Sequence, residues 1–191
     1  MKVFLLDNYD SFTYMLKDYI EQCGVECIVK RNDDESIIEH SLDEYDAIII
    51  SPGPKIPSES GNLMNIISTY HQQKPILGVC LGHQGIGEFF GAKLIKSQIP
   101  RHGKVDLIHH NHHELFEEIK NGIEVTRYHS LVLEEVTSPL EVIAWSERNE
   151  IMAVAHKELP IYGIQFHPES YMSKSGIKLI KNFFKLSKQL A

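Results

Sequence analysis

Cys80 is the cysteine whose sequence surroundings are typical of a nucleophile. It stands in the segment Gly78-Val79-Cys80-Leu81-Gly82-His83-Gln84, after the apolar run 76–79 and before a predicted helix. A sharp strand-to-helix turn of this kind lifts the central side chain above the end of a sheet, and the positive end of the helix dipole favours a thiolate. The alternative is a buried structural cysteine, which is our interpretation of Cys23 and Cys27.

A second segment supplies a base and a carboxylate. His167 and Glu169 stand two residues apart at the end of the apolar run 161–166. Residues two apart on a strand project from the same face, so we expect Glu169 to accept the imidazole N–H and to set the ring's tautomer. The other ring nitrogen can then deprotonate a thiol. Taken alone, His-Pro-Glu is explained equally well by a structural turn. Together with Cys80, however, His167 and Glu169 form a candidate Cys-His-Glu triad.

A third segment offers backbone donors for a developing negative charge. The apolar run 47–50 ends in the turn Ser51-Pro52-Gly53-Pro54, which can also be a simple strand terminator. In an open α/β sheet, ligands bind beyond the carboxyl ends of the strands, so this turn and the cysteine turn would share one edge. We therefore expect the N–H groups of Gly53 and Leu81 to form an oxyanion hole for acyl transfer.

Short apolar runs alternate with helical patterns in the first half of the chain. The runs suit strands buried on both faces at 2–6, 25–29, 47–50 and 76–79, and the helical patterns cover 11–23, 63–71 and 82–90. Asp10 or Ser11 is the expected N-cap of the first helix. After Gly91, turn signals predict antiparallel strands and hairpins, followed by an amphipathic helix from about Ser173.

These elements predict an α/β fold class. We expect one domain over residues 1–191, with a mostly parallel central sheet flanked by helices and with antiparallel strands in the second half. A chain of 191 residues with 42% apolar residues can bury a core without disulfide bonds or bound metal ions. This excludes a disordered chain and a disulfide-dependent mini-protein.

Charge and cysteine usage narrow the partners and the compartment. The formal charge of −7 and the absence of a Lys/Arg run argue against nucleic acid. No stretch of the sequence approaches the ~18 apolar residues of a membrane span, and the start is too short in apolar residues for a signal-peptide core. Three cysteines, an odd number, suit a reducing compartment. We therefore expect a cytoplasmic protein.

The chemical segments together resemble the class I (triad-type) glutamine amidotransferases. Residues 78–84 and 165–170 match the two signature stretches of that family, and the similarity continues at 7–14, 51–54, 102–104 and 128–131. The stretches 7–14 and 102–104 are similar to the branch that serves chorismate-using synthases, namely anthranilate synthase component II and the aminodeoxychorismate synthase glutaminase subunit. Three residues depart from the family pattern, namely Met15, Lys55 and Arg101.

The resemblance implies a reaction and a substrate. Cys80 would attack the side-chain amide of L-glutamine, His167 would shuttle the proton, and Glu169 would orient His167, so that a glutamyl thioester forms, ammonia leaves and water releases glutamate. Gly53 and Leu81 would supply the oxyanion donors, and no cofactor is expected in this chain. The residues that match the glutamine-binding positions are Gly53, Pro54, Lys55, Gln84, Ser130 and Leu131.

The resemblance also implies a protein partner. Ammonia producers of this family dock on a larger synthase subunit (component I), which uses the ammonia. The residues expected to form part of that interface are Asn8, Asp10, Ser11, His102, Gly103 and Lys104. Two other functions stay open at this point: a partner-independent cysteine hydrolase of γ-glutamyl amides, and a regulatory subunit without catalysis. The intact trio of Cys80, His167 and Glu169 disfavours the second.

The segment His109-His110-Asn111-His112-His113 invites a metal interpretation. Adjacent residues rarely converge on one tetrahedral centre, and neither cysteine nor carboxylate stands at a standard spacing from them. We therefore expect a solvated loop here and no metal site.

Overall fold

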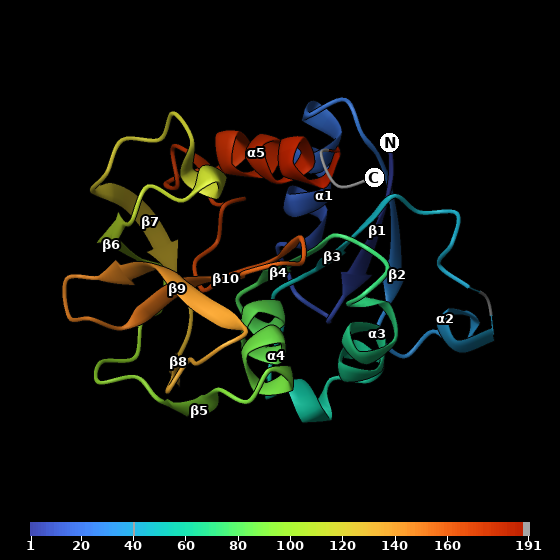
Figure 1. Cartoon of the computed structure of the whole chain (residues 1–191), viewed down its shortest axis with the longest axis horizontal. Coiled ribbons are helices and arrows are strands. Elements are labelled where there is room, and N and C mark those ends of the chain that lie inside the picture. The colour runs from blue at the N-terminus through green and yellow to red at the C-terminus, as the bar shows by residue number, and fades with distance from the viewer. Residues whose placement is uncertain (40, 189–191) are drawn as a thin grey trace.

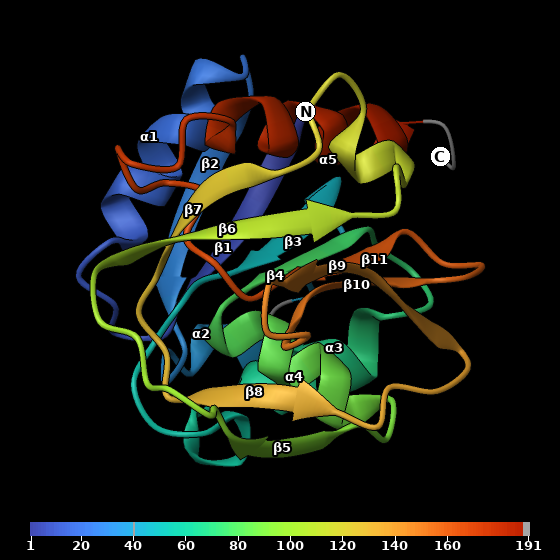
Figure 2. The same cartoon turned by 90° about the vertical axis from the view of Figure 1, so that its left-hand side faces the viewer.

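A large twisted sheet runs through the molecule, with helices on both of its faces (Figures 1 and 2). The computed structural model describes residues 1–39 and 41–188. The elements in chain order are β1 (Lys2–Asp7), α1 (Thr13–Gln22), β2 (Glu26–Arg31), α2 (Ser36–Glu39), β3 (Ala47–Ile50), η1 (Pro57–Glu59), α3 (Leu63–Tyr70), β4 (Ile76–Val79), α4 (Leu81–Phe89), β5 (Lys93–Lys96), β6 (Lys104–His110), η2 (Glu114–Phe116), β7 (Ile123–Arg127), β8 (Leu131–Glu134), β9 (Leu140–Ser146), β10 (Ile151–His156), β11 (Ile161–Ile164) and α5 (Gly176–Lys188).

The strand order explains how distant segments meet. In the described part of the chain, the large sheet has the order β2-β1-β3-β4-β11-β10-β9-β6-β7, and β5 pairs with β8 in a separate sheet. The pairs from β2 to β11 are parallel, and the pairs from β11 to β7 are antiparallel. The predicted α/β fold class is therefore confirmed. The late strand β11 inserts beside β4, so the end of the chain returns to its middle.

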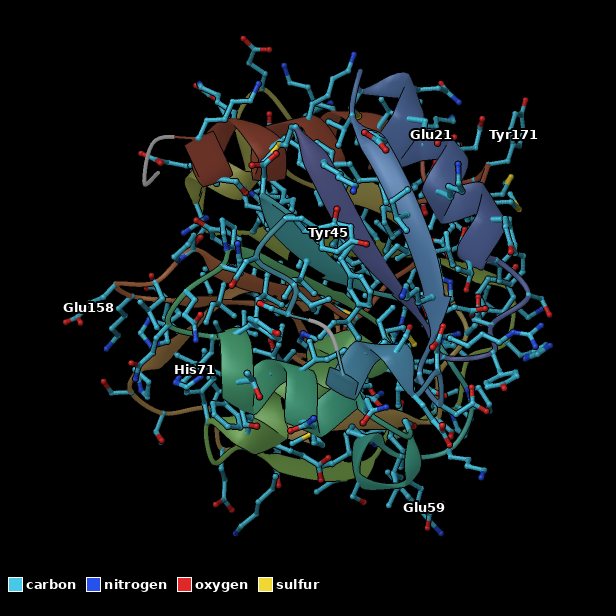
Figure 3. The ribbon with its side chains drawn as sticks, turned by 90° about the vertical axis from the view of Figure 1, so that its right-hand side faces the viewer. Glu21, Tyr45, Glu59, His71, Glu158 and Tyr171 are labelled. Carbon is cyan, nitrogen blue, oxygen red and sulfur yellow. The ribbon has the colours of Figure 1, made fainter. Side chains whose placement is uncertain are left out.

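Each face of the sheet has its own apolar core. Helices α1 and α5 cover one face, and α2, α3 and α4 cover the other, with the β5–β8 pair beyond α4 (Figure 2). Strands β3, β4 and β11 are buried along their whole length, as expected for strands covered on both sides. Helix α5 buries Leu179, Ile180 and Phe183 against the first face, while charged side chains such as Glu59 and Glu158 project outward (Figure 3).

Several element boundaries differ from the sequence-based expectations. Helix α1 has Phe12 as its N-cap rather than Asp10 or Ser11, and the Asp10 carboxylate instead accepts the Phe12 N–H at 2.7 Å. The closing helix begins at Gly176 rather than Ser173. The short elements α2, η1 and η2 were not predicted, because each is too short for a periodic pattern. Within the described ranges, none of the helices has the length and apolar character needed to cross a membrane.

Candidate active site

The site lies where four parallel strands end. Because β1, β3, β4 and β11 are parallel neighbours, the residues that follow them gather at one edge of the sheet. Cys80 follows β4, and its backbone N–H donates to the carbonyl oxygen of Ile164 in β11 at 2.8 Å. The residues after Ile164 therefore lie directly beside the cysteine.

Cys80 occupies a strained turn between β4 and α4. Its φ of +52° and ψ of −96° lie in a region that side-chain-bearing residues rarely adopt. The turn is this tight because α4 starts against the strand itself: a Cβ on Gly78 would stand 2.4 Å from the carbonyl carbon of Gly82. The sulfur is thus fixed at the start of a helix, as the sequence predicted, and the residue is 6% exposed.

His167 and Glu169 form a buried pair. The His167 Nδ1 and Glu169 Oε1 atoms are 2.6 Å apart, and the two residues are 2% and 0% exposed. They do not share a strand face, however, because β11 ends at Ile164 and the backbone then turns. The His167 N–H donates instead to the carbonyl oxygen of Thr126 at 3.0 Å. The contact was predicted, but the strand geometry used to predict it was wrong.

The electrostatics couple His167 to both partners. Burial lowers the pKa of His167, but hydrogen bonding and charge interactions with Cys80 and Glu169 outweigh burial and raise this pKa well above 6.5. The Nε2 atom is buried without a hydrogen bond of regular geometry to any described residue. The arrangement favours an imidazolium next to Cys80, which is the protonation state that a thiolate nucleophile requires.

A pocket of about 160 Å³ opens onto the sulfur. It is lined by Gly53, Pro54, Lys55, Cys80, Gln84, Tyr128, His129, Ser130 and Leu131. The structure thus brings all six predicted glutamine-binding residues to one pocket. Leu81 lies just behind its wall, since a Cβ on Gly53 would stand 2.9 Å from the Leu81 Cδ2 atom.

Sequence reasoning missed Tyr128 and His129 as pocket residues. Tyr128 packs its ring on that of His167 with centroids 4.9 Å apart, and Phe12 covers the same imidazole at 5.8 Å. The available signal was their place in the stretch 128–131, from which only Ser130 and Leu131 were selected.

A buried charged network holds the His129 wall. Arg127, 1% exposed, donates to Asp106 at 2.7 Å, to Glu150 at 2.5 Å and to the Nε2 atom of His129 at 2.9 Å. Burial, followed by the Arg127 charge, lowers the pKa of His129 to about 3. Because a neutral His129 accepts at Nε2, its proton is on Nδ1, which donates to the carbonyl oxygen of Leu131 at 2.8 Å. The side of the pocket that His129 forms is therefore uncharged and held by hydrogen bonds.

The residues expected at a partner interface separate into two groups. Asn8 is 2% exposed, and its side chain donates to the carbonyl oxygen of Ser51 at 2.9 Å, so its assignment to a surface was wrong. It holds the turn after β3 instead. Asp10 is half-buried near His167, and burial raises its pKa. The exposed members of the set are Ser11, His102, Gly103 and Lys104.

The exposed members lie beside the catalytic pair. The His102 ring packs on Tyr128 with centroids 5.6 Å apart, and Tyr128 in turn packs on His167. Arg101 donates its backbone N–H to the carbonyl oxygen of His129 at 3.0 Å. Any protein bound over residues 101–104 would therefore be connected to the imidazole through the rings of His102 and Tyr128.

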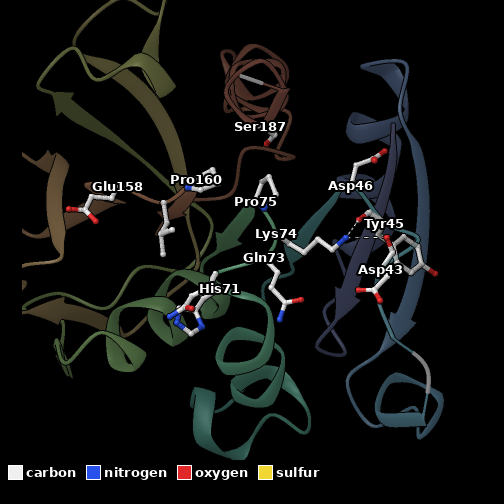
Figure 4. Close-up of a pocket in the computed structure, with 12 residues that line it drawn as sticks. Asp43, Tyr45, Asp46, His71, Gln73, Lys74, Pro75, Glu158, Pro160 and Ser187 are labelled. Carbon is white, nitrogen blue, oxygen red and sulfur yellow. Dashed lines mark hydrogen bonds between the residues drawn. The ribbon is translucent and has the colours of Figure 1, made fainter. Parts of the chain in front are cut away.

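A larger hollow lies elsewhere on the described surface. A cavity of about 410 Å³ sits where β3, β4 and β11 begin, at the opposite end of the sheet from Cys80 (Figure 4). Its cation, Lys74, already donates to the carbonyl oxygens of Asp43 at 3.1 Å and Tyr45 at 2.8 Å. The residues that line this hollow include neither a cysteine nor a residue with a positive φ, so the smaller pocket is the candidate site.

The histidine-rich segment has local structural roles. The Nδ1 atom of His113 accepts the Leu115 N–H at 3.1 Å, and the ring of His110 stacks on Phe116 with centroids 4.5 Å apart. Over residues 1–39 and 41–188, no three His, Cys, Asp or Glu side chains are grouped so that they could hold a metal ion. The expected solvated loop is only partly correct, because His109 and His110 are the last residues of strand β6 and His110 is buried.

The chain is similar to known proteins in both sequence and fold. The sequence profile described as Glutamine amidotransferase class-I matches residues 4–186. Anthranilate synthase component 2 of Thermus thermophilus is 44% identical over 186 residues, covering 96% of this chain and 91% of that protein. Aminodeoxychorismate synthase component 2 of Escherichia coli is 43% identical over 183 residues, covering 95% and 98%.

A solved structure shares the fold. The crystal structure of a protein from Thermoplasma acidophilum, described as part of a GMP synthase, superposes with a TM-score of 0.88 at 26% identity, covering 100% of this chain and 95% of the other. Profile, sequence and structure therefore agree over essentially the whole chain.

Proposed function

The chain belongs to the class-I glutamine amidotransferase family, and we propose that it is the glutaminase subunit of a chorismate-using synthase. It hydrolyses L-glutamine at Cys80 and passes the ammonia to a synthase partner. The observation that carries this proposal is the buried His167–Glu169 pair held at 2.6 Å beside a strained cysteine. A subunit that only regulates a partner has no use for a strained nucleophile, since backbone strain costs stability.

The geometry supports a two-step acyl transfer. In the first step, the Cys80 sulfur attacks the side-chain carbonyl carbon of glutamine while the oxyanion faces the backbone near Gly53 and Leu81. The C–N bond then breaks, and the imidazolium of His167 gives its proton to the departing amide nitrogen, which leaves as ammonia. In the second step, water gives a proton to His167 and attacks the thioester, which releases glutamate and restores the thiolate.

The pocket has the chemistry for a small amino acid amide. Its described inner wall is uncharged, because His129 is neutral and its Nδ1 proton is engaged with Leu131. Lys55 is exposed at the mouth, where its ammonium can meet the α-carboxylate of glutamine. The neutral amide would thus enter first and the charged end would stay at the rim.

Exposed apolar side chains mark the surface for the partner. Among the described residues, the large hydrophobic side chains that are exposed are Tyr9, Tyr14, Met15, Ile99, Val105, Tyr171 and Met172. They fall in three segments, 9–15, 99–105 and 171–172. The segment 9–15 contains Phe12, which contacts His167. The segment 99–105 contains His102, which contacts Tyr128. The segment 171–172 follows Glu169 closely in the sequence. An apolar surface around a reactive centre fits a protein that receives ammonia there.

A glutaminase assay with matched variants tests the catalytic half of the proposal. We expect Cys80→Ala to abolish glutamate release, while Cys27→Ala retains it, because Cys27 lies in the core and burial raises its pKa to about 12. Equal turnover by the wild type and Cys80→Ala would eliminate the thiol mechanism.

Product analysis tests the partner half. Two relatives of nearly equal identity have different names, so identity does not select between anthranilate and aminodeoxychorismate. The protein should be mixed with each candidate synthase subunit, chorismate and glutamine, and the aromatic product identified. We expect one mixture or both to show a glutaminase rate that rises with the partner. Full activity without any added protein would support the partner-independent hydrolase instead.

A further inference from the structure

Gln165 touches the nucleophile, yet the triad mechanism gives it no role. Its side chain is 0% exposed, and its Nε2 atom lies 3.6 Å from the Sγ atom of Cys80, within hydrogen-bond distance for sulfur. The residue reaches this position because it follows β11, which pairs with β4 in parallel register. A buried amide directed at a reactive sulfur calls for an explanation, because amides in apolar cores are costly unless both ends are bonded.

The orientation of this amide is set by a chain of hydrogen bonds. The Leu131 carbonyl oxygen can only accept, and it accepts from the Nε2 atom of Gln84 at 3.2 Å. The same Nε2 atom lies 3.3 Å from the Oε1 atom of Gln165. Once Gln84 turns its NH₂ group to Leu131, Gln165 must turn its oxygen to Gln84 and its own NH₂ group to the sulfur.

We propose that Gln165 is a catalytic residue that donates an N–H to the Cys80 thiolate, and that Gln84 is the positioning residue that fixes its amide. The proposal rests on the proposed function, in which Cys80 is the nucleophile. A neutral donor stabilises the thiolate without competing with the His167 charge. The sulfur loses its negative charge when the thioester forms. When the C–S bond breaks, its electron pair returns to sulfur, and the Gln165 N–H stabilises that charge again.

The pH dependence of thiol alkylation tests this donor directly. Iodoacetamide reacts with the thiolate, so the rate of Cys80 alkylation rises with pH through a midpoint that reports how well the site stabilises the thiolate. We expect Gln165→Leu to move this midpoint upward by about one pH unit. Gln165→Glu, which has nearly the same shape, should move it further, because a carboxylate beside the sulfur repels the thiolate. Gln84→Leu should move it in the same direction by less.

The controls separate an effect on the Gln165–Cys80 hydrogen bond from a general loss of structure. Cys80→Ala measures the background from Cys23 and Cys27, whose burial raises their pKa values. Gln73→Leu removes an exposed amide that donates to the nearby carbonyl oxygen of Thr69, and it should leave the midpoint unchanged.

Two outcomes would overturn the proposal. The first is an unchanged midpoint in both Gln165→Leu and Gln165→Glu. The second, if Gln165→Leu fails to fold, is an unchanged midpoint in both Gln165→Glu and Gln84→Leu. Alkylation needs neither glutamine nor a partner, so loss of the proposed glutaminase activity would not by itself alter these results. In the glutaminase assay, the matching expectation for Gln165→Glu is a lower kcat with little change in KM.

Discussion

The imidazole of His167 is surrounded by groups that control its protonation. Glu169 bonds one ring nitrogen, Cys80 faces the other, and the rings of Tyr128 and Phe12 cover the sides. The described contacts leave little freedom for the ring to turn. Glu169 raises the pKa of His167, so its charge helps to keep the imidazole protonated next to the sulfur.

Replacing the carboxylate should change both the rate and its pH dependence. In Glu169→Gln the shape is retained, but the charge that raises the pKa of His167 is lost. We expect kcat to fall by about 10²- to 10⁴-fold, with KM for glutamine nearly unchanged. Activity needs a protonated His167 to give its proton to the departing amide nitrogen, so the alkaline limb of the kcat profile should move to lower pH.

Steady-state glutaminase kinetics over a range of pH measure this effect. Glu158→Gln is the matched control, because Glu158 is an exposed carboxylate at the other end of the sheet (Figure 4). An alkaline limb at the same pH in Glu169→Gln and the wild type would show that Glu169 does not set the protonation of His167.

The junction of β4 and α4 is the element on which the nucleophile depends. The backbone of Cys80 has a positive φ because the helix begins directly against the strand. Glycine adopts such a conformation at little cost, whereas a side chain there is strained. The backbone at position 80 is therefore strained because the site requires a cysteine, rather than a glycine, at this turn.

Two variants at this junction should show an inverted order of stability. In the middle of a helix or strand, alanine is more stabilising than glycine, because glycine loses more backbone entropy on folding. At position 80 we expect Cys80→Gly to be more stable than Cys80→Ala by about 1 kcal/mol, because glycine relieves the positive φ. Urea denaturation of the two variants measures the difference. A Cys80→Ala protein that is as stable as Cys80→Gly would mean that the turn is unstrained.

Across the whole molecule, buried neutral histidines make stability depend on pH. Burial lowers the pKa values of His83 and His129 to about 3 each. The folded protein therefore keeps them neutral at pH values where the unfolded chain, with an ordinary pKa near 6.5, binds protons. Because the unfolded state binds more protons, the free energy of unfolding falls as the pH drops from about 6.5 toward 3.

Removing one of these groups should flatten the acid side of the stability curve. When the pH falls from 7 to 5, His129 alone should lower the free energy of unfolding of the wild type by about 2 kcal/mol. We expect His129→Gln to be less stable than the wild type at pH 7. Between pH 7 and pH 5, however, its free energy of unfolding should fall by about 2 kcal/mol less than that of the wild type. Urea titrations at several pH values test this expectation, and parallel curves for the two proteins would contradict it.

The partner surface also belongs to the scale of the whole molecule. Lys104 starts β6, is exposed, and lies in the segment that packs on Tyr128 through His102. We expect Lys104→Ala to weaken complex formation and partner-stimulated glutaminase activity by about 10-fold, as truncation of an interface residue does. Lys157→Ala, outside the three apolar segments, is the matched control. If binding and stimulation are both unchanged in Lys104→Ala, residues 102–104 are not part of the interface.

Local features of the sequence determined the elements and part of the chemistry. Buried strands and amphipathic helices leave periodic patterns, because each element shows its apolar face along a short stretch of chain. The turn at Cys80 was predictable for the same reason, since a strand, a glycine and a helix follow one another directly. The pairing of His167 with Glu169 was predictable because two residues so close in the chain meet in many backbone conformations.

Only the tertiary structure decided what meets across the chain. The insertion of β11 beside β4 brings His167 and Gln165 to Cys80, and no local pattern records which distant strands will pair. The same holds for Asn8, whose polarity suggested a surface but which is buried with its hydrogen bonds satisfied by Ser51. Polar residues can lie in a core wherever distant partners bond them, and those partners are fixed by the packing of the whole chain rather than by neighbours in sequence.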